Sequence, residues 1–218
     1  MNIPILFEDA EALVIDKPGG LPIDRPRAGG ACLEDYLVDL KLGFQREPWP
    51  VHRLDQDTSG CLLLARNPKA LKRFSHAFEE HVVEKRYLGI VDGVPAETEG
   101  TIALSLSKVS TAKTGWRMIP ARKGKPSVTH WRTLATIDGR ALVEFRPETG
   151  RTHQIRVHAA SGLGFALLGD PIYGSKKGAP RTMLHAAGLT VPRGEKEPIL
   201  AVSPLPADFR ALGFTELE

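Results

Sequence analysis

Short runs of apolar residues alternate with polar and turn-forming residues along most of the chain, which predicts many strands and few long helices. Residues 3–7 and 12–16 form two such runs on either side of Glu8-Asp9, and this pattern predicts a hairpin. Four further strands are predicted at 87–91, 101–106, 128–136 and 141–145. Because these strands follow one another with few intervening crossover helices, we expect a largely antiparallel sheet.

Two segments show helical spacing instead. Leu33, Tyr36, Leu37 and Leu40 repeat at intervals of three and four residues. A clearer helix is predicted after Asn67, which can cap it, with Pro68 in its first position. Its apolar stripe, which we assign to the core and not to a cofactor site, consists of Leu71, Phe74, Phe78 and Val82.

The run 52–60, His-Arg-Leu-Asp-Gln-Asp-Thr-Ser-Gly, carries the strongest chemical signal. It breaks any regular periodicity and leads directly into the apolar run 61–65, so Asp55 is expected in a turn at the mouth of the sheet. A carboxylate held there suits a nucleophile or a base. From the residues alone, a structural ion pair between Arg53 and Asp55 explains the run equally well.

A calcium-binding loop is a second alternative for the same run, because Asp55, Asp57, Ser59 and Gly60 match the opening of such a loop. The twelfth position is Arg66 where a glutamate is required, and an apolar run follows where a helix is required. We therefore reject calcium.

The run 52–60 resembles the signature of the RluA family of RNA pseudouridine synthases. Further segments match the same family in the same order, namely 16–21, 85–87, 150–158, 168–174 and 184–186. The resemblance covers nearly the whole chain. It implies an α+β catalytic domain, with a mixed, largely antiparallel sheet flanked by helices and a central cleft that binds RNA.

The resemblance also implies roles for individual residues. Asp55 corresponds to the catalytic acid, Tyr87 stacks on the target base and can take a proton, and Arg151 pairs with Asp55. Leu184 packs in the floor of the pocket, and Arg53 fills the space left when the uridine is extruded from the folded RNA.

Composition and length agree with one catalytic domain over residues 1–218, without an N-terminal domain of the S4 type. The hydrophobic content of 42% is ordinary, and no stretch of about 18 apolar residues predicts a membrane span. Cys32 and Cys61 do not form a CxxC pattern, and we expect neither a disulfide nor a metal site from them. A cytoplasmic location is expected.

Positive charge is concentrated between residues 101 and 132, which contain seven Lys or Arg residues and no acid. Without these seven, 22 basic residues remain against 26 acids in the rest of the chain, although the net charge is +3. We predict that this basic stretch, and Lys123 and Lys125 in particular, contacts RNA phosphates. The alternative is a solvated loop that happens to be basic. Trp116 and Trp131 lie within the stretch and can stack on a base or pack in the core, which is the better interpretation for Trp131.

The remaining histidines and motifs do not point to a cofactor. His153 and His158 are five residues apart, unlike the spacing of four typical of zinc on a helix, and we interpret both as structural. His52, before the turn, is interpreted as a packed hydrogen-bonding residue. There is no GxGxxG and no GxxxxGK[ST], so a nucleotide cofactor has no support.

The sequence therefore predicts an RNA pseudouridine synthase that acts on rRNA or tRNA as a monomer and without a cofactor. An alternative is a catalytically idle RNA-binding or RNA-folding protein on the same scaffold. A nucleoside or glycoside hydrolase is disfavoured, because hydrolysis needs a pair of carboxylates that activate water. The residues do not distinguish attack of Asp55 on C1′ of the ribose from attack on C6 of the base.

Overall fold

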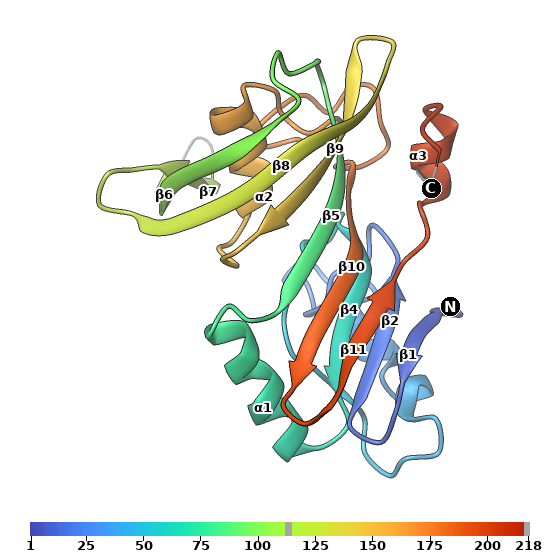
Figure 1. Ribbon diagram of the computed structural model, residues 1–218. Coiled ribbons are helices and arrows are strands. Elements are labelled where there is room, and N and C mark those ends of the chain that lie inside the picture. Colours follow the sequence, from blue (N-terminus) through green and yellow to red (C-terminus); the bar gives the residue numbers. More distant parts are fainter. Residues whose placement is uncertain (112–114, 216–218) are drawn as a thin grey trace. The chain divides into compact units, whose positions relative to one another are not determined.

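A computed structural model describes residues 1–111 and 115–215 (Figure 1). The chain forms two compact units, and each is assembled from separate stretches of sequence. Unit 1 comprises residues 1–85 and 185–204, and unit 2 comprises residues 86–184 and 205–218. No helix in the described part of the chain is both long and apolar enough to cross a membrane.

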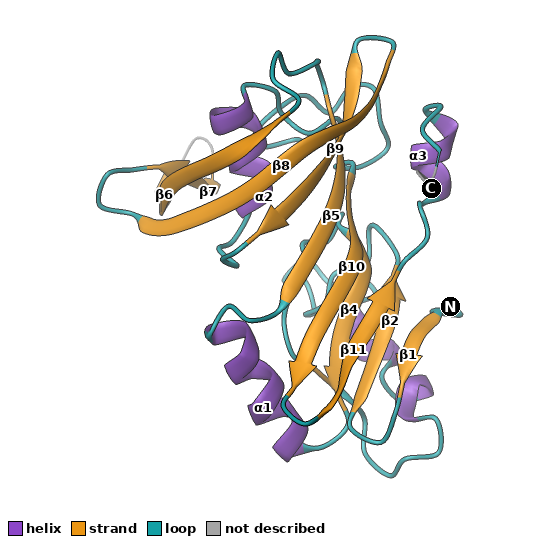
Figure 2. Ribbon diagram, in the orientation of Figure 1, coloured by secondary structure: helices purple, strands orange, loops and turns teal. Residues whose placement is uncertain are grey.

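Unit 1 is a sheet with one long helix and two short 3₁₀ turns (Figure 2). Its sheet has the order β1-β2-β4-β10, with β11 paired to β10 and β3 paired to β4. The strands are β1 (Ile5–Glu8), β2 (Ala12–Lys17), β3 (Trp49–Pro50), β4 (Ser59–Ala65), β10 (Leu184–Arg193) and β11 (Lys196–Val202). The 3₁₀ turns are η1 (Leu33–Tyr36) and η2 (Asp39–Lys41), and the helix is α1 (Pro68–Glu79).

Unit 2 is a second sheet segment, ordered β5-β9-β8-β6-β7, in which the described pairings are antiparallel. Long strands dominate it, as Figure 1 shows for β6 and β8. The strands are β5 (Glu84–Val91), β6 (Glu99–Thr111), β7 (Gly115–Pro120), β8 (Lys125–Ile137) and β9 (Arg140–Pro147). Helix α2 (Gln154–Val157) continues into a π-helical turn, η3 (His158–Leu163), and α3 (Ala207–Ala211) lies near the C-terminus.

The predicted elements are confirmed in most respects. The N-terminal hairpin is formed by β1 and β2, and the four other predicted strands lie within β5, β6, β8 and β9. The mixed but largely antiparallel sheet is also confirmed, since β4 and β10 pair in parallel and the other described pairings are antiparallel. The segment around Leu33 forms 3₁₀ turns where helical spacing was seen.

Helix α1 begins as predicted but ends earlier. The side chain of Asn67 accepts a 2.9 Å hydrogen bond from the N–H of Ala70, and Pro68 occupies the first turn. The helix ends before His81, whose φ of 58° is left-handed. This residue changes the register of the following chain, so Val82 is exposed and Val83 is buried in its place. The assignment of Val82 to the buried stripe is therefore wrong.

Strands β4 and β10 approach each other unusually closely at Gly60. Ala186 is the parallel partner of Gly60, and a Cβ atom on Gly60 would lie 2.2 Å from its carbonyl oxygen. Gly60 also has a φ of 104°, a backbone conformation that residues other than glycine rarely adopt. Only glycine therefore fits at the end of the run that contains Asp55.

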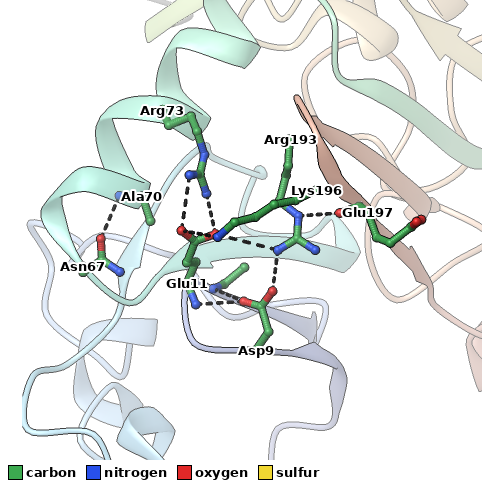
Figure 3. A network of polar contacts seen from close by, with 9 residues as sticks. Asp9, Glu11, Asn67, Ala70, Arg73, Arg193, Lys196 and Glu197 are labelled. Atoms are coloured by element: carbon green, nitrogen blue, oxygen red, sulfur yellow. Dashed lines mark hydrogen bonds and ion pairs between the residues drawn. The ribbon is translucent and has the colours of Figure 1, made fainter.

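An ion-pair network joins the turn before β2 to α1 and to the β10–β11 turn in unit 1 (Figure 3). Arg73 lies 2.7 Å from one oxygen of Glu11, and Lys196 lies 3.1 Å from the other. The hydrogen bond from Arg73 is the main cause that lowers the pKa of Glu11 to about 2. Asp9, next in the network, pairs with Arg193.

This network predicts a loss of stability in acid. Because the pKa of Glu11 is depressed on folding, its contribution is complete above its unfolded pKa of 4.5 and disappears as the pH falls through about 2. We expect Glu11→Gln to lower the free energy of unfolding by about 1 kcal/mol at pH 6. The difference from wild type should shrink as urea unfolding is repeated toward pH 3, and a difference that does not change with pH would contradict this assignment.

Candidate active site

Asp55 lies in a tight turn at the entrance of β4 in unit 1. The N–H of Thr58 donates a 3.0 Å hydrogen bond to the carbonyl of Asp55, which closes the turn. Every residue of β4 is buried, so the strand behind the turn is firmly packed. The predicted position of Asp55 at the mouth of the sheet is confirmed.

A buried lysine, Lys17, also holds this turn, through the carbonyl of Gln56. Lys17 has no exposed surface, and its ammonium donates to the carbonyl oxygens of Pro18, Leu21 and Gln56 at 2.8 to 3.0 Å. Gln56, the residue after Asp55, also accepts from the N–H of Gly20 at 3.0 Å. The segment after β2 and the Asp55 turn are therefore fastened together through backbone carbonyls.

His52 supports the strand that follows the Asp55 turn. His52 accepts a 3.0 Å hydrogen bond from the N–H of Leu63 and stacks on Phe78 with ring centroids 4.5 Å apart. Burial, together with the positive charge of Lys85, lowers the pKa of His52 to about 3, so it is neutral at physiological pH. Burial also lowers the pKa of Lys85 to about 8. The interpretation of His52 as a packed hydrogen-bonding residue is confirmed.

His185 ties β10 to the strand that follows the Asp55 turn. Its Nδ1 lies 2.9 Å from the hydroxyl of Ser59, and its Nε2 lies 3.4 Å from the carbonyl of Ser203. A carbonyl oxygen can only accept, so in the neutral ring Nε2 carries the proton and Nδ1 accepts from Ser59. The imidazole is completely buried and bridges β4 to the segment after β11.

In unit 2, Tyr87 and Leu184 contribute to one apolar cluster. Tyr87 lies opposite Phe145 in the β5–β9 pairing and packs, half-buried, against a core that includes Phe145 and Leu184. Gly89, two residues further along β5, leaves room for this cluster, because a Cβ atom there would lie 2.7 Å from Leu167. The structure thus places two of the predicted site residues in the same cluster. Trp131 packs against it too, as predicted.

Arg151 lies in the turn before α2, and a buried glutamine fixes that turn. The side-chain oxygen of Gln154 accepts from the N–H of Arg151 at 2.9 Å and from the hydroxyl of Thr149 at 2.8 Å. Its NH₂ group donates to the carbonyl of Val128 and to the hydroxyl of Thr129, both at 3.0 Å. The Arg151 guanidinium donates through Nε to the carbonyl of Pro126 at 3.2 Å.

A buried ion pair holds α2 against the segment that contains Asp170. Arg156 binds both carboxylate oxygens of Asp170, at 2.7 and 2.8 Å, and both side chains are buried. Burial is the largest single influence on the pKa of Asp170 and acts to raise it, but the hydrogen bond and charge of Arg156, together with the N–H groups of Ile172 and Tyr173, outweigh it and the pKa is lowered. His158 is also buried and has Ser127 2.8 Å from its Nε2, and burial lowers its pKa to about 4. The structural interpretation of His158 is confirmed.

The described part of the basic stretch lies mostly on strands, with Arg122 and Lys123 in the turn between β7 and β8. Lys125 begins β8, and Lys123 is exposed in the turn between β7 and β8. A backbone contact makes this turn tight, since a Cβ atom on Gly124 would lie 2.6 Å from the backbone of Leu106. Of the seven cations, six lie within the described residues, and Lys113 lies outside them.

Asp55 and Arg53 belong to unit 1, whereas Tyr87, Arg151, Leu184 and the two lysines belong to unit 2. The pairing of Asp55 with Arg151 therefore stays a prediction, as do the roles assigned to Arg53, Lys123 and Lys125. Sequence reasoning assigned no role to Lys17 or Gln154. Their only signal was their presence in the matched segments 16–21 and 150–158.

Residues 11–161 match the family described as RNA pseudouridylate synthase. The chain belongs to this family, whose members are isomerases, and the RluA-type assignment made from the motifs is confirmed.

Two relatives and one solved structure show how far the similarity extends. The chain is 57% identical to an uncharacterized RNA pseudouridine synthase of Zymomonas mobilis over 96% of its own length and 97% of the relative's. It is 37% identical to ribosomal large subunit pseudouridine synthase D of the same organism, over 84% of this chain and 60% of that one. Human RNA pseudouridylate synthase domain containing 4 superimposes with a TM-score of 0.79 at 27% identity, covering 96% and 93% of the two chains. The pseudouridine synthase fold is thereby confirmed.

Proposed function

We propose that this protein converts specific uridines of rRNA or tRNA to pseudouridine, with Asp55 as the catalytic aspartate and without a cofactor. The observation that carries the proposal is the fixed Asp55 turn, which Lys17 fastens through the carbonyl of Gln56 at the head of a fully buried strand. A preorganised carboxylate is what the reaction requires, because a misplaced catalytic group reduces the rate sharply.

The reaction breaks the bond between N1 of uracil and C1′ of the ribose and forms a bond between C5 and C1′. The hydrogen on C5 leaves as a proton, and N1 gains one, so that the product is an isomer of the substrate. Asp55 either attacks C1′ or C6 or stabilises the positive ribose while uracil departs as a delocalised anion.

The other site residues have supporting roles in this proposal. Tyr87 stacks on the target base from its place beside Phe145, and Leu184, in the same cluster, forms the apolar floor. Arg151 pairs with Asp55, and the buried Gln154 keeps the Arg151 backbone in place. Arg53 fills the gap left by the extruded uridine.

An rRNA target is supported by the 37% identity to a protein named ribosomal large subunit pseudouridine synthase D, and tRNA is the alternative. We also propose a cytoplasmic location, since both cysteines are buried and free, as is usual in a reducing compartment. The protein is proposed to act as a monomer, which analytical ultracentrifugation can check.

The decisive test uses RNA labelled with tritium at C5 of uridine. Formation of the new bond releases that tritium to solvent, so wild-type protein should release it from total cellular RNA in a buffer that contains a chelator. Fractionation into ribosomal and transfer RNA then identifies the target. No release from any fraction by folded protein that binds RNA would favour the idle-scaffold alternative.

The proposed RNA contact of the basic stretch gives a separate prediction. We expect Lys123→Gln with Lys125→Gln to weaken RNA binding about tenfold and to reduce the slope of log K against log salt by about 1 to 2. Neutralising two exposed lysines of α1, Lys69 and Lys72, is the matched control and should leave the slope unchanged. An unchanged slope in the first variant would remove these lysines from the RNA interface.

A further inference from the structure

The hairpin of β6 and β7 presents an exposed tryptophan on a supported face. Trp116 and Met118 are two residues apart on β7 and so point to the same side of the strand. Met118 is buried against Leu106 and Val157, which places this side toward α2. Trp116 continues the same row but is 43% exposed. The row is thus buried at Met118 and open to solvent at Trp116.

A ladder of rings holds Trp116 in place. The indole lies 4.8 Å from the imidazole of His153 at 30°, and His153 meets Tyr173 edge to face at 5.6 Å. The phenol oxygen of Tyr173 accepts from the N–H of Met118 at 2.9 Å and lies 2.9 Å from Nδ1 of His153. One hydroxyl therefore joins strand β7 to the turn that carries Arg151.

The base of this ladder is rigid. The guanidinium of Arg156 lies 5.2 Å from the Tyr173 ring and is itself held by the buried Asp170. Asp170 also accepts from the N–H of Tyr173 at 3.1 Å. His153 has a φ of 53°, a strained conformation for a residue with a side chain, and such strain persists only where the surroundings fix it.

A cation lies directly against Trp116. Lys108 places its ammonium 4.7 Å from the indole centroid. The sequence from residue 101 to 132 contains no acid. An exposed aromatic ring beside a cation suits a ligand that combines a flat base with a phosphate, as an unpaired nucleotide does.

We infer that Trp116 is a stacking platform for an unpaired base of the substrate RNA, distinct from the target uridine. The base takes the place of the Lys108 ammonium over the indole, and the ammonium pairs with the phosphate of that nucleotide. This inference rests on the proposed function in taking RNA as the substrate. Stacking on an aromatic ring tolerates any base, so the platform adds affinity and fixes the position of the strand without reading sequence. Through Tyr173 and His153, the position of the bound strand is linked to the turn of Arg151.

Two fluorescent probes separate stacking from charge. One is a single-stranded oligoadenylate of about twelve nucleotides, and the other is an abasic ribose-phosphate oligomer of the same length and charge. Affinities for wild type, Trp116→Leu and Trp116→Phe are measured by anisotropy at low salt with the full chain. Neither probe contains uridine, so binding is measured without turnover.

We expect Trp116→Leu to bind oligoadenylate about 5- to 100-fold more weakly than wild type and to bind the abasic oligomer equally well. Trp116→Phe should recover most of the loss, since phenylalanine keeps an aromatic face. Equal weakening with both probes would show that Trp116 only shapes the hairpin and would overturn the inference, as would unchanged affinity for oligoadenylate.

The outcome is independent of the tritium assay. If Trp116 contributes to oligoadenylate binding but the protein releases no tritium, the stacking inference stands and the proposed isomerisation is rejected. If the protein releases tritium but substitution of Trp116 changes the affinities for the two probes equally, the proposed function stands and the stacking inference is rejected.

Discussion

Replacing Asp55 with asparagine is expected to abolish tritium release while RNA binding stays within about threefold of wild type. Asparagine has the same shape and keeps the backbone turn closed by Thr58, but it lacks the carboxylate charge that the proposed mechanism requires for attack on the substrate or for stabilising the positive ribose. Loss of a nucleophile that acts directly on the substrate lowers kcat by at least about 10³-fold. Single-turnover assays with labelled RNA in excess protein measure this loss.

Asp57→Asn is the matched control, because it removes a carboxylate from the same turn two residues away. It should keep most of the activity. Persistent product formation in Asp55→Asn would reject Asp55 as the catalytic group, and an equal loss in both variants would point to the charge of the turn as a whole.

Lys17→Met is expected to give the largest loss of stability among these variants, about 2 to 4 kcal/mol in the free energy of unfolding. Methionine fills a similar volume but leaves the carbonyls of Pro18, Leu21 and Gln56 without the ammonium that they now bind. An unsatisfied buried acceptor costs about 1 to 3 kcal/mol. The Asp55 turn also loses its anchor, so we expect the rate of tritium release to fall about 10- to 100-fold.

Urea unfolding and the tritium assay on the same preparation test this prediction. Lys41→Met is the control, since Lys41 is partly exposed and pairs with Glu47 at 3.7 Å near the surface. That change should cost less than about 1 kcal/mol. A Lys17→Met protein with wild-type stability and rate would show that the carbonyls are satisfied without the ammonium.

Local signals predicted the elements that depend on local chemistry. Asn67 and Pro68 mark the start of α1 because a cap and a fixed φ act within one turn. The end of α1 was missed because His81 adopts a left-handed conformation that the sequence does not mark, and Val82 was misplaced with it. Strand β7 was missed as well, being a short strand of mixed polarity that pairs with the outer part of β6.

The candidate site was predictable only where a motif carries the chemistry in its own side chains. Asp55 could be proposed from its place in a turn before an apolar run, whereas the roles of Tyr87 and Arg151 came from the motifs that resemble those of the family. Lys17 and Gln154 could not be proposed, because their partners are mostly backbone groups, which every residue has and no sequence pattern distinguishes. The ladder through His153 joins residues 57 positions apart and needs three dimensions to be seen.

The division of each unit into separate stretches of sequence determines when either can fold during synthesis. Gly60 of β4 pairs with Ala186 of β10. More than a hundred further residues must therefore be synthesised before β4 has its partner strand on that side. Unit 2 is also incomplete without α3, whose Phe209 is fully buried and whose Asp208 pairs with Arg181. Both units can therefore be completed only after β10 and α3 have been synthesised, and until then the apolar strand β4 is exposed to aggregation with other chains.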